Sequence, residues 1–144
     1  MDKKIGVGVG VMIQNEKGEI LLGLRNPDKI KVAGELDGQG TWTMPGGKVD
    51  FHETLIDAAI REIKEETNLV AKNLELISLC DDFSETAHYV SAGFLATEIQ
   101  GEPKTMEPET ILEWRWFALD HLPKNIYKPS LAVVKKYLAK RIYM

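Results

Sequence analysis

The sequence predicts an α/β protein, an α/β/α sandwich in which a mixed β-sheet lies between one central helix and one closing helix. Several short segments are rich in β-branched residues and are bounded by glycine, asparagine or proline, as strands joined by turns usually are. Two longer segments carry apolar residues at the spacing of one helix face. The 144 residues contain no repeat or linker, so a single domain spanning 1–144 is expected.

The N-terminal part of the chain predicts two strands followed by a loop. Residues 5–13 and Glu19–Arg25 are predicted as the strands of a hairpin, because residues 15–18 between them are a turn signal. Residues 26–40 contain one proline and three glycines, which favour a mobile loop. A short strand over Thr41–Pro45 then leads into a double glycine.

The segment from Thr54 to Asn68 predicts the central helix. Its apolar residues at positions i, i+3, i+4 and i+7 are Ile56, Ala59, Ile60 and Ile63. Asparagine tolerates the left-handed backbone conformation found just beyond a helix end, so the helix is expected to end at Asn68.

The second half of the chain predicts further strands and the closing helix. Strands are expected over 74–80, 88–99 and 113–118, and a loop rich in proline and glutamate over 101–110. The closing helix is predicted from an apolar stripe at Leu131, Val134, Leu138 and, less regularly, Ile142. Pro129 suits the first turn of that helix.

Composition restricts the classes of function. The net charge is −4 and no segment forms a basic track, so nucleic acid polymers are not expected as partners. No apolar segment approaches membrane-spanning length, so no membrane association is expected. The single cysteine, Cys80, cannot form an intrachain disulfide, which favours a reducing, cytoplasmic location.

Three glutamates near the end of the central helix carry the clearest chemical signal. Glu62 precedes Glu65 by three residues and Glu66 by four, so the three carboxylates are predicted to crowd one helix face. Their mutual repulsion and the negative end of the helix dipole make this arrangement unfavourable for stability alone. One interpretation is a solvated charged face. The other is a site for a hard divalent cation, which prefers carboxylate oxygens.

These glutamates belong to a longer pattern. Gly47, then Glu53 after five residues, then residues 61–69 (REIKEETNL) after seven more resemble the Nudix box, G-x5-E-x7-R-E-U-x-E-E-x-G-U with U aliphatic. Only Asn68 departs from this pattern, at a position where the family has glycine. The WTMPGG, HYV, EPKTMEP and EWRWF segments extend the resemblance over nearly the whole chain. They are similar to the branch of small nucleotide-pool-cleansing (8-oxo-dGTP diphosphatase-like) pyrophosphatases.

The resemblance implies a Nudix-type sandwich with a catalytic loop-helix-loop that binds a metal ion. Glu62 and Glu66 would hold the main ion, expected to be Mg²⁺ with Mn²⁺ as the alternative. Glu65 would reach a second ion or a metal-bound water. The backbone carbonyl group of Gly46 would complete the coordination shell.

The resemblance also implies supporting residues and a base. Glu53 and Arg61 would pair and, with Gly47, brace the loop against the helix. A loop glutamate would take the proton from the attacking water, with Glu109 as the first candidate and Glu107 as the next. For both, an exposed acidic loop is the alternative interpretation.

Positive charge is needed to meet the substrate phosphates. Arg25 and Lys48 are the candidates, because arginine and lysine are the side chains that bind phosphate. For Lys48, simple surface solvation is an equally good interpretation.

The predicted reaction is hydrolysis of a nucleoside triphosphate, including an oxidised deoxynucleotide, to the monophosphate and pyrophosphate. The same chemistry on ADP-ribose, a nucleotide sugar or a prenyl diphosphate is one alternative. A non-catalytic nucleotide-sensing module is another. A homodimer is a further expectation from this branch of the family.

Overall fold

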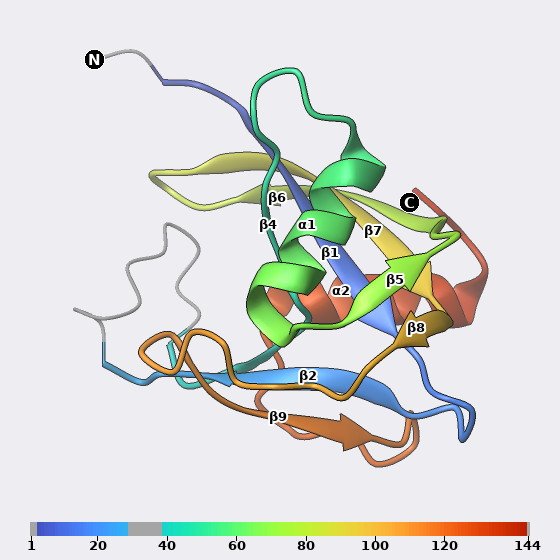
Figure 1. Cartoon of the computed structure of the whole chain (residues 1–144). Coiled ribbons are helices and arrows are strands. Elements are labelled where there is room, and N and C mark those ends of the chain that lie inside the picture. Colours follow the sequence, from blue (N-terminus) through green and yellow to red (C-terminus); the bar gives the residue numbers. More distant parts are fainter. Residues whose placement is uncertain (1–2, 29–38, 144) are drawn as a thin grey trace.

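The computed structural model describes residues 3–28 and 39–143 (Figure 1). Its elements are, in chain order, β1 (Gly6–Ile13), β2 (Ile20–Arg25), β3 (Trp42–Thr43), β4 (Gly46–Lys48), α1 (Leu55–Thr67), β5 (Val70–Lys72), β6 (Glu75–Phe83), β7 (His88–Ala96), β8 (Glu98–Gln100), β9 (Ile111–Phe117) and α2 (Lys128–Ala139). Most of the loop predicted over 26–40 lies outside the described residues. The loop predicted over 101–110 contains neither helix nor strand, as expected.

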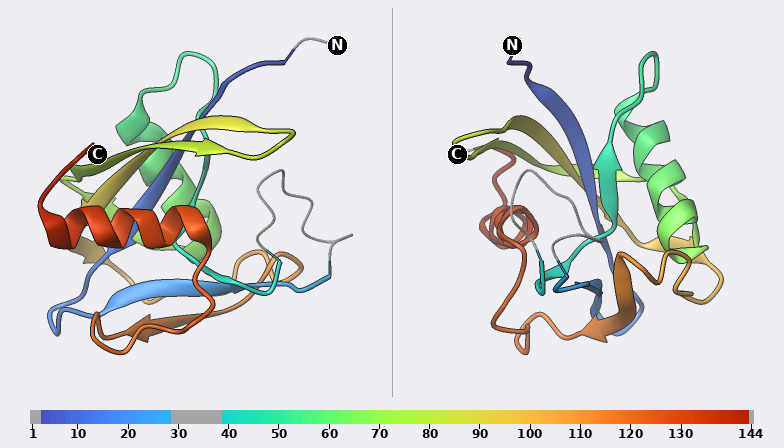
Figure 2. Two further views of the ribbon diagram at one scale, coloured as in Figure 1. Left: turned by 180° about the vertical axis from the view of Figure 1, so that it is seen from behind. Right: turned by 90° about the vertical axis from the view of Figure 1, so that its left-hand side faces the viewer.

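The strands form three sheets, of which the four-stranded one is central. Its strand order is β4-β1-β7-β6. Strand β1 runs parallel to β7 and antiparallel to β4, so the sheet is mixed, as predicted. The remaining strands form a three-stranded sheet, β3-β2-β9, and a two-stranded sheet, β5-β8. Helices α1 and α2 lie on opposite faces of the central sheet (Figure 2), and the predicted α/β/α sandwich is confirmed.

The predicted hairpin between the first two strands is wrong in part. The turn itself is present, because the N–H of Gly18 donates to the carbonyl oxygen of Asn15 at 3.0 Å and that of Asn15 donates to Glu19 at 3.0 Å. Beyond a single bridge between Gln14 and Ile20, however, β1 and β2 diverge into different sheets. Each strand instead pairs with strands that come later in the chain, β1 with β7 and β2 with β9.

Strand β1 separates two hydrophobic clusters, because successive side chains of a strand point to opposite faces. Val9, Val11 and Ile13 pack in the cluster that contains the buried side chains of α1. Met12 points the other way and packs with Val133 of α2. The central sheet thus has an α1 face and an α2 face. Odd-numbered residues of β1 point to the α1 face and even-numbered residues to the α2 face.

The buried face of α1 differs from the predicted stripe at its first residue. Ile56 is 45% exposed, whereas Ala58, Ala59, Ile63 and Thr67 are buried. Small alanine side chains at the contact let the helix approach the sheet closely. The helix is therefore oriented by Ala58, Ala59 and Ile63, and not by Ile56.

Helix α2 buries only part of the predicted stripe, namely Val134. Leu138 is 60% exposed and Ile142 is exposed as well, whereas Ser130, Val133 and Val134 are buried. Val133 lies over Gly93 of β7, where an added Cβ would come within 2.9 Å of it. This close contact fixes the rotation of α2. Neither helix in the described part of the chain has the length and apolar content needed to cross a bilayer.

Candidate active site

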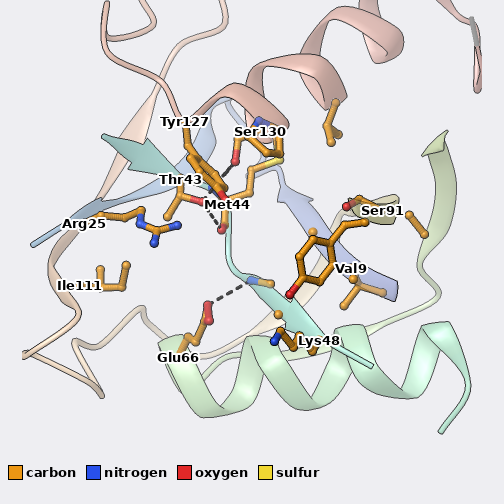
Figure 3. Close-up of a pocket in the computed structure, with 18 of the residues that line it drawn as sticks. Val9, Arg25, Thr43, Met44, Lys48, Glu66, Ser91, Ile111, Tyr127 and Ser130 are labelled. Carbon is orange, nitrogen blue, oxygen red and sulfur yellow. Dashed lines mark hydrogen bonds between the residues drawn. The ribbon is translucent and has the colours of Figure 1, made fainter. Parts of the chain in front are cut away.

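A cavity of about 580 Å³ opens between the α2 face of the central sheet, the C-terminal part of α1 and the loop over 101–110 (Figure 3). Of the residues predicted to form the site, Arg25, Gly46, Gly47, Lys48 and Glu66 line this cavity. The cavity is roomy enough for a small-molecule substrate and combines apolar walls with a few converging polar groups, which is typical of ligand sites.

The floor of the cavity contains glycines whose role the sequence did not reveal. Gly8 and Gly10 line the cavity and occupy alternate positions of β1, so they share its α2 face. A Cβ added at Gly10 would meet no atom within 4 Å, and Gly8 lines the cavity with it. Bare backbone at these positions keeps the cavity open. The alternation of glycines with a period of two was the available signal.

Helix α1 is held in place by caps at both ends. The hydroxyl of Thr54 accepts a hydrogen bond from the N–H of Asp57 at 3.0 Å, as an N-cap does. Asn68 adopts the left-handed conformation with φ of 66°, and its N–H donates to the carbonyl oxygen of Lys64. Asparagine therefore takes the backbone role of the family's glycine, as predicted.

Glu66 and Glu62 are the two acidic side chains of α1 that face the double glycine of β4. The Glu66 carboxylate accepts a hydrogen bond from the N–H of Gly46 at 3.1 Å (Figure 3). Burial, and then the neighbouring charge of Glu62, raise the pKa of Glu66 well above its ordinary value. The pKa of Glu62 is raised as well, chiefly by burial and against the effect of Arg61. The two carboxylates are thus neighbours, and within the described part of the chain only that of Glu62 has a cationic partner, Arg61.

The double glycine permits this approach between β4 and α1. A Cβ at Gly47 would lie 2.5 Å from the carboxylate of Glu62. A Cβ at Gly46 would lie 2.1 Å from the carbonyl oxygen of Val9, which belongs to the neighbouring strand. Gly46 is therefore required by the sheet, whereas Gly47 is required by the site.

Arg61 connects the loop after β4 to α1. Its guanidinium donates to both oxygens of Glu53, at 2.7 and 2.9 Å, and to the carbonyl oxygen of Lys48 at 3.1 Å. These hydrogen bonds hold the pKa of Glu53 at about 2, below its ordinary value of 4.5. The bracing geometry expected of Glu53 and Arg61 is present.

Arg61 also binds two of the three glutamates that were predicted to converge. Its Nη1 atom lies 2.8 Å from Glu62 and 3.3 Å from Glu65, and Glu65 is largely exposed. Within residues 3–28 and 39–143, no three carboxylate, imidazole or thiolate side chains are gathered closely enough to hold a metal ion by themselves. Glu62 and Glu65 thus contact the same guanidinium nitrogen, and the role of Glu65 at a second ion stays a prediction.

The loop over 101–110 is tied to the end of α1. The N–H of Lys104 donates to the carbonyl oxygen of Thr67 at 2.9 Å. In β9, just after the loop, the indole N–H of Trp114 donates to the carbonyl oxygen of Glu66 at 3.2 Å. This attachment places Glu107 in the lining of the cavity, where its charge helps to raise the pKa values of Glu62 and Glu66.

The first candidate for the base, Glu109, lies elsewhere on the same loop. It is exposed and is absent from the cavity lining, and its carbonyl oxygen accepts a hydrogen bond from the side chain of Asn26 at 2.9 Å. The geometry therefore favours Glu107, which was the next candidate.

Two cations line the cavity, and each lies over an aromatic ring. The guanidinium of Arg25 is 4.7 Å from the ring centre of Tyr127, and the ammonium group of Lys48 is 5.6 Å from that of Tyr89. Burial raises the pKa of Tyr127, against the effect of the Arg25 charge. Arg25 Nε is buried and has no hydrogen-bond partner among the described residues. Buried donors are usually satisfied, so an acceptor from a ligand is expected here.

The N-terminus of α2 closes the cavity opposite α1. The hydroxyl of Ser130 accepts from the N–H of Met44 at 3.0 Å and lies 3.2 Å from the hydroxyl of Thr43, while the N–H of Tyr127 donates to Trp42 at 2.7 Å. Sequence reasoning missed Tyr127 and Ser130, which belong to no motif and reach the site only through these contacts.

The donor set fits a divalent cation. Mg²⁺ is commonly bound by one or two carboxylates and takes its remaining oxygens from water and substrate phosphates. Glu62, which pairs with Arg61 at 2.8 Å, and Glu66, which has no cationic partner among the described residues, supply two neighbouring carboxylates; burial raises the pKa of both, and the charge of Glu66 lacks compensation. A hard cation would supply that compensation, so the residues present match the requirement.

Comparisons with known proteins agree with this geometry. The chain matches the NUDIX domain family over residues 4–137. A relative named RNA pyrophosphohydrolase, from Pelagibacter ubique, is 30% identical, and the match covers 88% of this chain and 90% of the relative. The ADP-ribose pyrophosphatase of Methanocaldococcus jannaschii is 33% identical, with 69% of this chain and 59% of the relative covered.

A solved structure supports the same assignment. The crystal structure of a MutT NUDIX hydrolase from Burkholderia pseudomallei has a TM-score of 0.83 and 33% sequence identity, and the match covers 93% of this chain and 98% of that one. The chain therefore belongs to the NUDIX domain family and is a Nudix hydrolase that acts on a diphosphate substrate.

Proposed function

We propose that the protein hydrolyses nucleoside triphosphates, including oxidised deoxynucleotides, to the monophosphate and pyrophosphate, with Mg²⁺ as its metal and Mn²⁺ as a substitute. The observation that carries this proposal is the convergence, in one cavity, of an uncompensated carboxylate with two cations, Arg25 and Lys48. A triphosphate has enough negative charge to engage a divalent cation and both basic side chains. The related structure titled MutT NUDIX hydrolase is in line with this choice.

In the proposed reaction, the oxygen of a water molecule forms a bond to one phosphorus of the bridge between the α- and β-phosphates. The bond between that phosphorus and the bridging oxygen breaks, the monophosphate and pyrophosphate separate, and one proton of the water passes to a carboxylate, for which Glu107 is the candidate. Glu62, Glu66 and the carbonyl group of Gly46 would hold Mg²⁺, which when bound neutralises phosphate charge and acidifies water. Glu65 stays a prediction for a second ion.

The cationic side chains orient the substrate. Arg25 presents a planar guanidinium that can bind two phosphate oxygens at once, and the Tyr127 ring holds it in that position. The buried Nε atom of Arg25 would find its missing acceptor in the substrate. Lys48 would bind a second phosphate as a point charge. The remaining part of the cavity, between Ser91, Ser130 and Val133, would hold the base.

The test is a substrate panel with purified protein, with and without Mg²⁺. It contains ordinary and 8-oxo triphosphates, ADP-ribose, nucleotide sugars, a prenyl diphosphate and 5′-triphosphorylated RNA. Mg²⁺-dependent release of pyrophosphate from a triphosphate, lost in Glu66→Gln, supports the proposal. Turnover restricted to a substrate that is not a triphosphate would overturn it. Nucleotide binding without turnover would indicate the sensing module instead.

Two further predictions concern the setting of the enzyme. We expect a cytoplasmic protein, because the lone Cys80 is buried and reduced. A homodimer stays a prediction, and sedimentation of the purified chain would test it.

A further inference from the structure

The ring of Tyr89 lies against bare backbone in the central sheet. Gly6 of β1 and Tyr89 of β7 are paired across the parallel strands, so position 6 and the tyrosine face the same side of the sheet. A Cβ added at Gly6 would lie 2.7 Å from one carbon of the Tyr89 ring and closer still to its neighbour. Any side chain at position 6 would push the ring away, so glycine is what lets the ring lie across β1.

The ammonium group of Lys48 lies over this ring, 5.6 Å from the ring centre. The backbone of Lys48 is anchored, because its carbonyl oxygen accepts a hydrogen bond from Arg61 at 3.1 Å. Its side chain is a flexible stem on an exposed residue, and such a stem adopts many conformations in water. The face of an aromatic ring attracts a cation, so Tyr89 favours the conformations that keep the ammonium group at the cavity.

The position of the ammonium group suits a substrate phosphate. Lys48 lies on the α1 side of the cavity, as does Glu66, the candidate metal ligand (Figure 3). A phosphate held by a metal ion at Glu66 would therefore be close to this cation. An ammonium group has three N–H donors, so its contact with a ring is compatible with hydrogen bonds to phosphate oxygens.

The other cation of the cavity is placed differently, although it also lies over a ring. Arg25 has a rigid planar head, its Nε atom is buried, and it lies 4.7 Å from the ring centre of Tyr127. Burial restricts Arg25 in addition to the ring. Lys48 is exposed, so its placement depends more strongly on the aromatic contact.

We propose that Tyr89 is a positioning residue for phosphate binding. Its ring, seated on the backbone of Gly6, holds the Lys48 ammonium group at the cavity before the substrate arrives, so less side-chain entropy is lost on binding. This inference rests on the proposed function, because it requires that Lys48 meets a substrate phosphate. Tyr89 acts through Lys48 and needs no contact with the substrate.

The expected effect is moderate and concerns binding. The entropy lost in ordering one long side chain corresponds to about a two- to tenfold change in affinity. Lys48 would hold the phosphate both before and during the reaction, so loss of the ring should raise KM and leave kcat nearly unchanged. Damage to the metal site would lower kcat instead, and damage to the fold would lower the free energy of unfolding.

The first test compares Tyr89→Leu, which removes the aromatic face, with Tyr89→Phe, which keeps the ring and loses only the hydroxyl. With dGTP and Mg²⁺, Tyr89→Leu should raise KM by about two- to tenfold with kcat within about twofold of the wild-type value. Tyr89→Phe should behave as the wild type. Phe51→Leu is the matched control, because this ring is 90% exposed and lies outside the cavity. Equal losses in Tyr89→Phe and Tyr89→Leu would contradict the proposal.

The second test is a double-mutant cycle between Tyr89 and Lys48. The measured quantity is the Kd, with Mg²⁺, of a dGTP analogue that has a methylene group in place of the oxygen between the α- and β-phosphates. Lys48→Gln should weaken binding by about tenfold or more. Adding Tyr89→Leu to Lys48→Gln should then change the Kd by less than about twofold. An equal effect of Tyr89→Leu in both backgrounds would mean that Tyr89 does not act through Lys48.

Gly6 offers an independent way to displace the ring. Gly6→Ala should weaken binding of the analogue about as much as Tyr89→Leu does, but it should have less than about a twofold effect in the Tyr89→Leu background. Val7→Ala, at the exposed neighbouring position on the opposite face of β1, is the control for a general effect on the strand. Unchanged binding in a folded Gly6→Ala variant would show that the ring need not lie on β1.

Failure of this inference can be distinguished from failure of the proposed function. Turnover of dGTP with independent effects of the Tyr89 and Lys48 changes would overturn this inference alone. Turnover of ADP-ribose without turnover of dGTP would overturn the proposed substrate. The same cycle, measured as kcat/KM for ADP-ribose, would then support the positioning role if the two effects are coupled and overturn it if they are independent.

Discussion

Two glutamates attached to α1 lie in opposite electrostatic surroundings. Glu53, just before the helix, accepts two hydrogen bonds from Arg61, and its pKa falls to about 2. Glu66, in the last turn, faces the Glu62 carboxylate in a buried position, and its pKa rises well above the ordinary value. The chain compensates the first charge and leaves the second uncompensated. At the N-terminal end of the helix, Arg61 neutralises Glu53. At the C-terminal end, a cation from solution would compensate Glu66.

The largest expected effect comes from removing the uncompensated charge. Glu66→Gln keeps the shape of the side chain and its acceptor for the Gly46 N–H, yet it should lower kcat/KM by about 10³-fold or more, because a group at the reacting phosphates is lost. Glu65→Gln, at the exposed Arg61 contact, should cost less than about tenfold. Steady-state kinetics at saturating Mg²⁺ compare the two variants. Equal losses would mean that the exposed and buried glutamates share one function.

Removal of Arg61, which compensates the charge of Glu53, should mainly lower the free energy of unfolding. Arg61→Gln removes the donors to Glu53 and to the Lys48 carbonyl oxygen, so the free energy of unfolding should fall by about 2 kcal/mol. Lys64→Gln, an exposed change on the same helix, should shift it by less than about 0.5 kcal/mol. Urea denaturation followed by circular dichroism measures both. A loss of activity at Arg61 with unchanged stability would refute the bracing role.

Glu107 and Glu109, on the loop over 101–110, are the two candidates for the base, and their variants can be compared directly. Glu107→Gln should lower kcat by about tenfold or more, because a positioned base is lost, whereas Glu109→Gln should leave kcat within about twofold of the original value. Both residues are exposed and lie on the same loop, so each serves as the control for the other. The reverse order of effects would restore Glu109 as the base.

The smallest effect concerns stability in the absence of metal. A raised pKa means that the folded protein holds the Glu66 proton more tightly than the unfolded chain, so stability falls as the pH rises from 4.5 through the raised pKa. Glu66→Gln should therefore stabilise the metal-free protein by about 1 kcal/mol near pH 8.

Glu53 should show the opposite sign. Its pKa is lowered, so the stability it contributes is present above 4.5 and is lost as the pH falls toward about 2. Thermal unfolding in chelator between about pH 3 and pH 8 measures both residues, with Glu53→Gln removing the acid dependence and Glu66→Gln the alkaline one. A Glu66→Gln variant that is less stable than the wild type near pH 8 would show that the buried charge is already compensated.

The central helix and its chemistry could be predicted from the sequence because they lie in one continuous segment. The spacing of Arg61, Glu62 and Glu66 fixes their relation on a regular helix, and Asn68 ends that helix as expected. The fate of Glu65 could not be predicted in this way. Its i,i+4 contact with Arg61 is compatible with the spacing, but which of its acidic neighbours Arg61 binds depends on side-chain conformation.

The rest of the site could not be predicted because it is assembled from distant segments. Tyr127 and Ser130 reach the cavity through contacts with β3, and Gly8 and Gly10 contribute by lacking side chains. The rotation of α2 was predicted wrongly because its most apolar stripe is not the one that fits against Gly93. Local periodicity identifies a helix, but the opposing surface decides which face is buried.

The most direct test of the role of Glu66 is a titration with Mn²⁺. The electron paramagnetic resonance signal of the free ion is followed for the wild type and for variants. The account predicts that Glu66→Gln weakens binding by about tenfold or more, whereas Glu53→Gln leaves the affinity within about twofold of the wild-type value. Unchanged Mn²⁺ affinity in Glu66→Gln, with the fold intact by circular dichroism, would contradict the claim that this carboxylate is held for a metal ion.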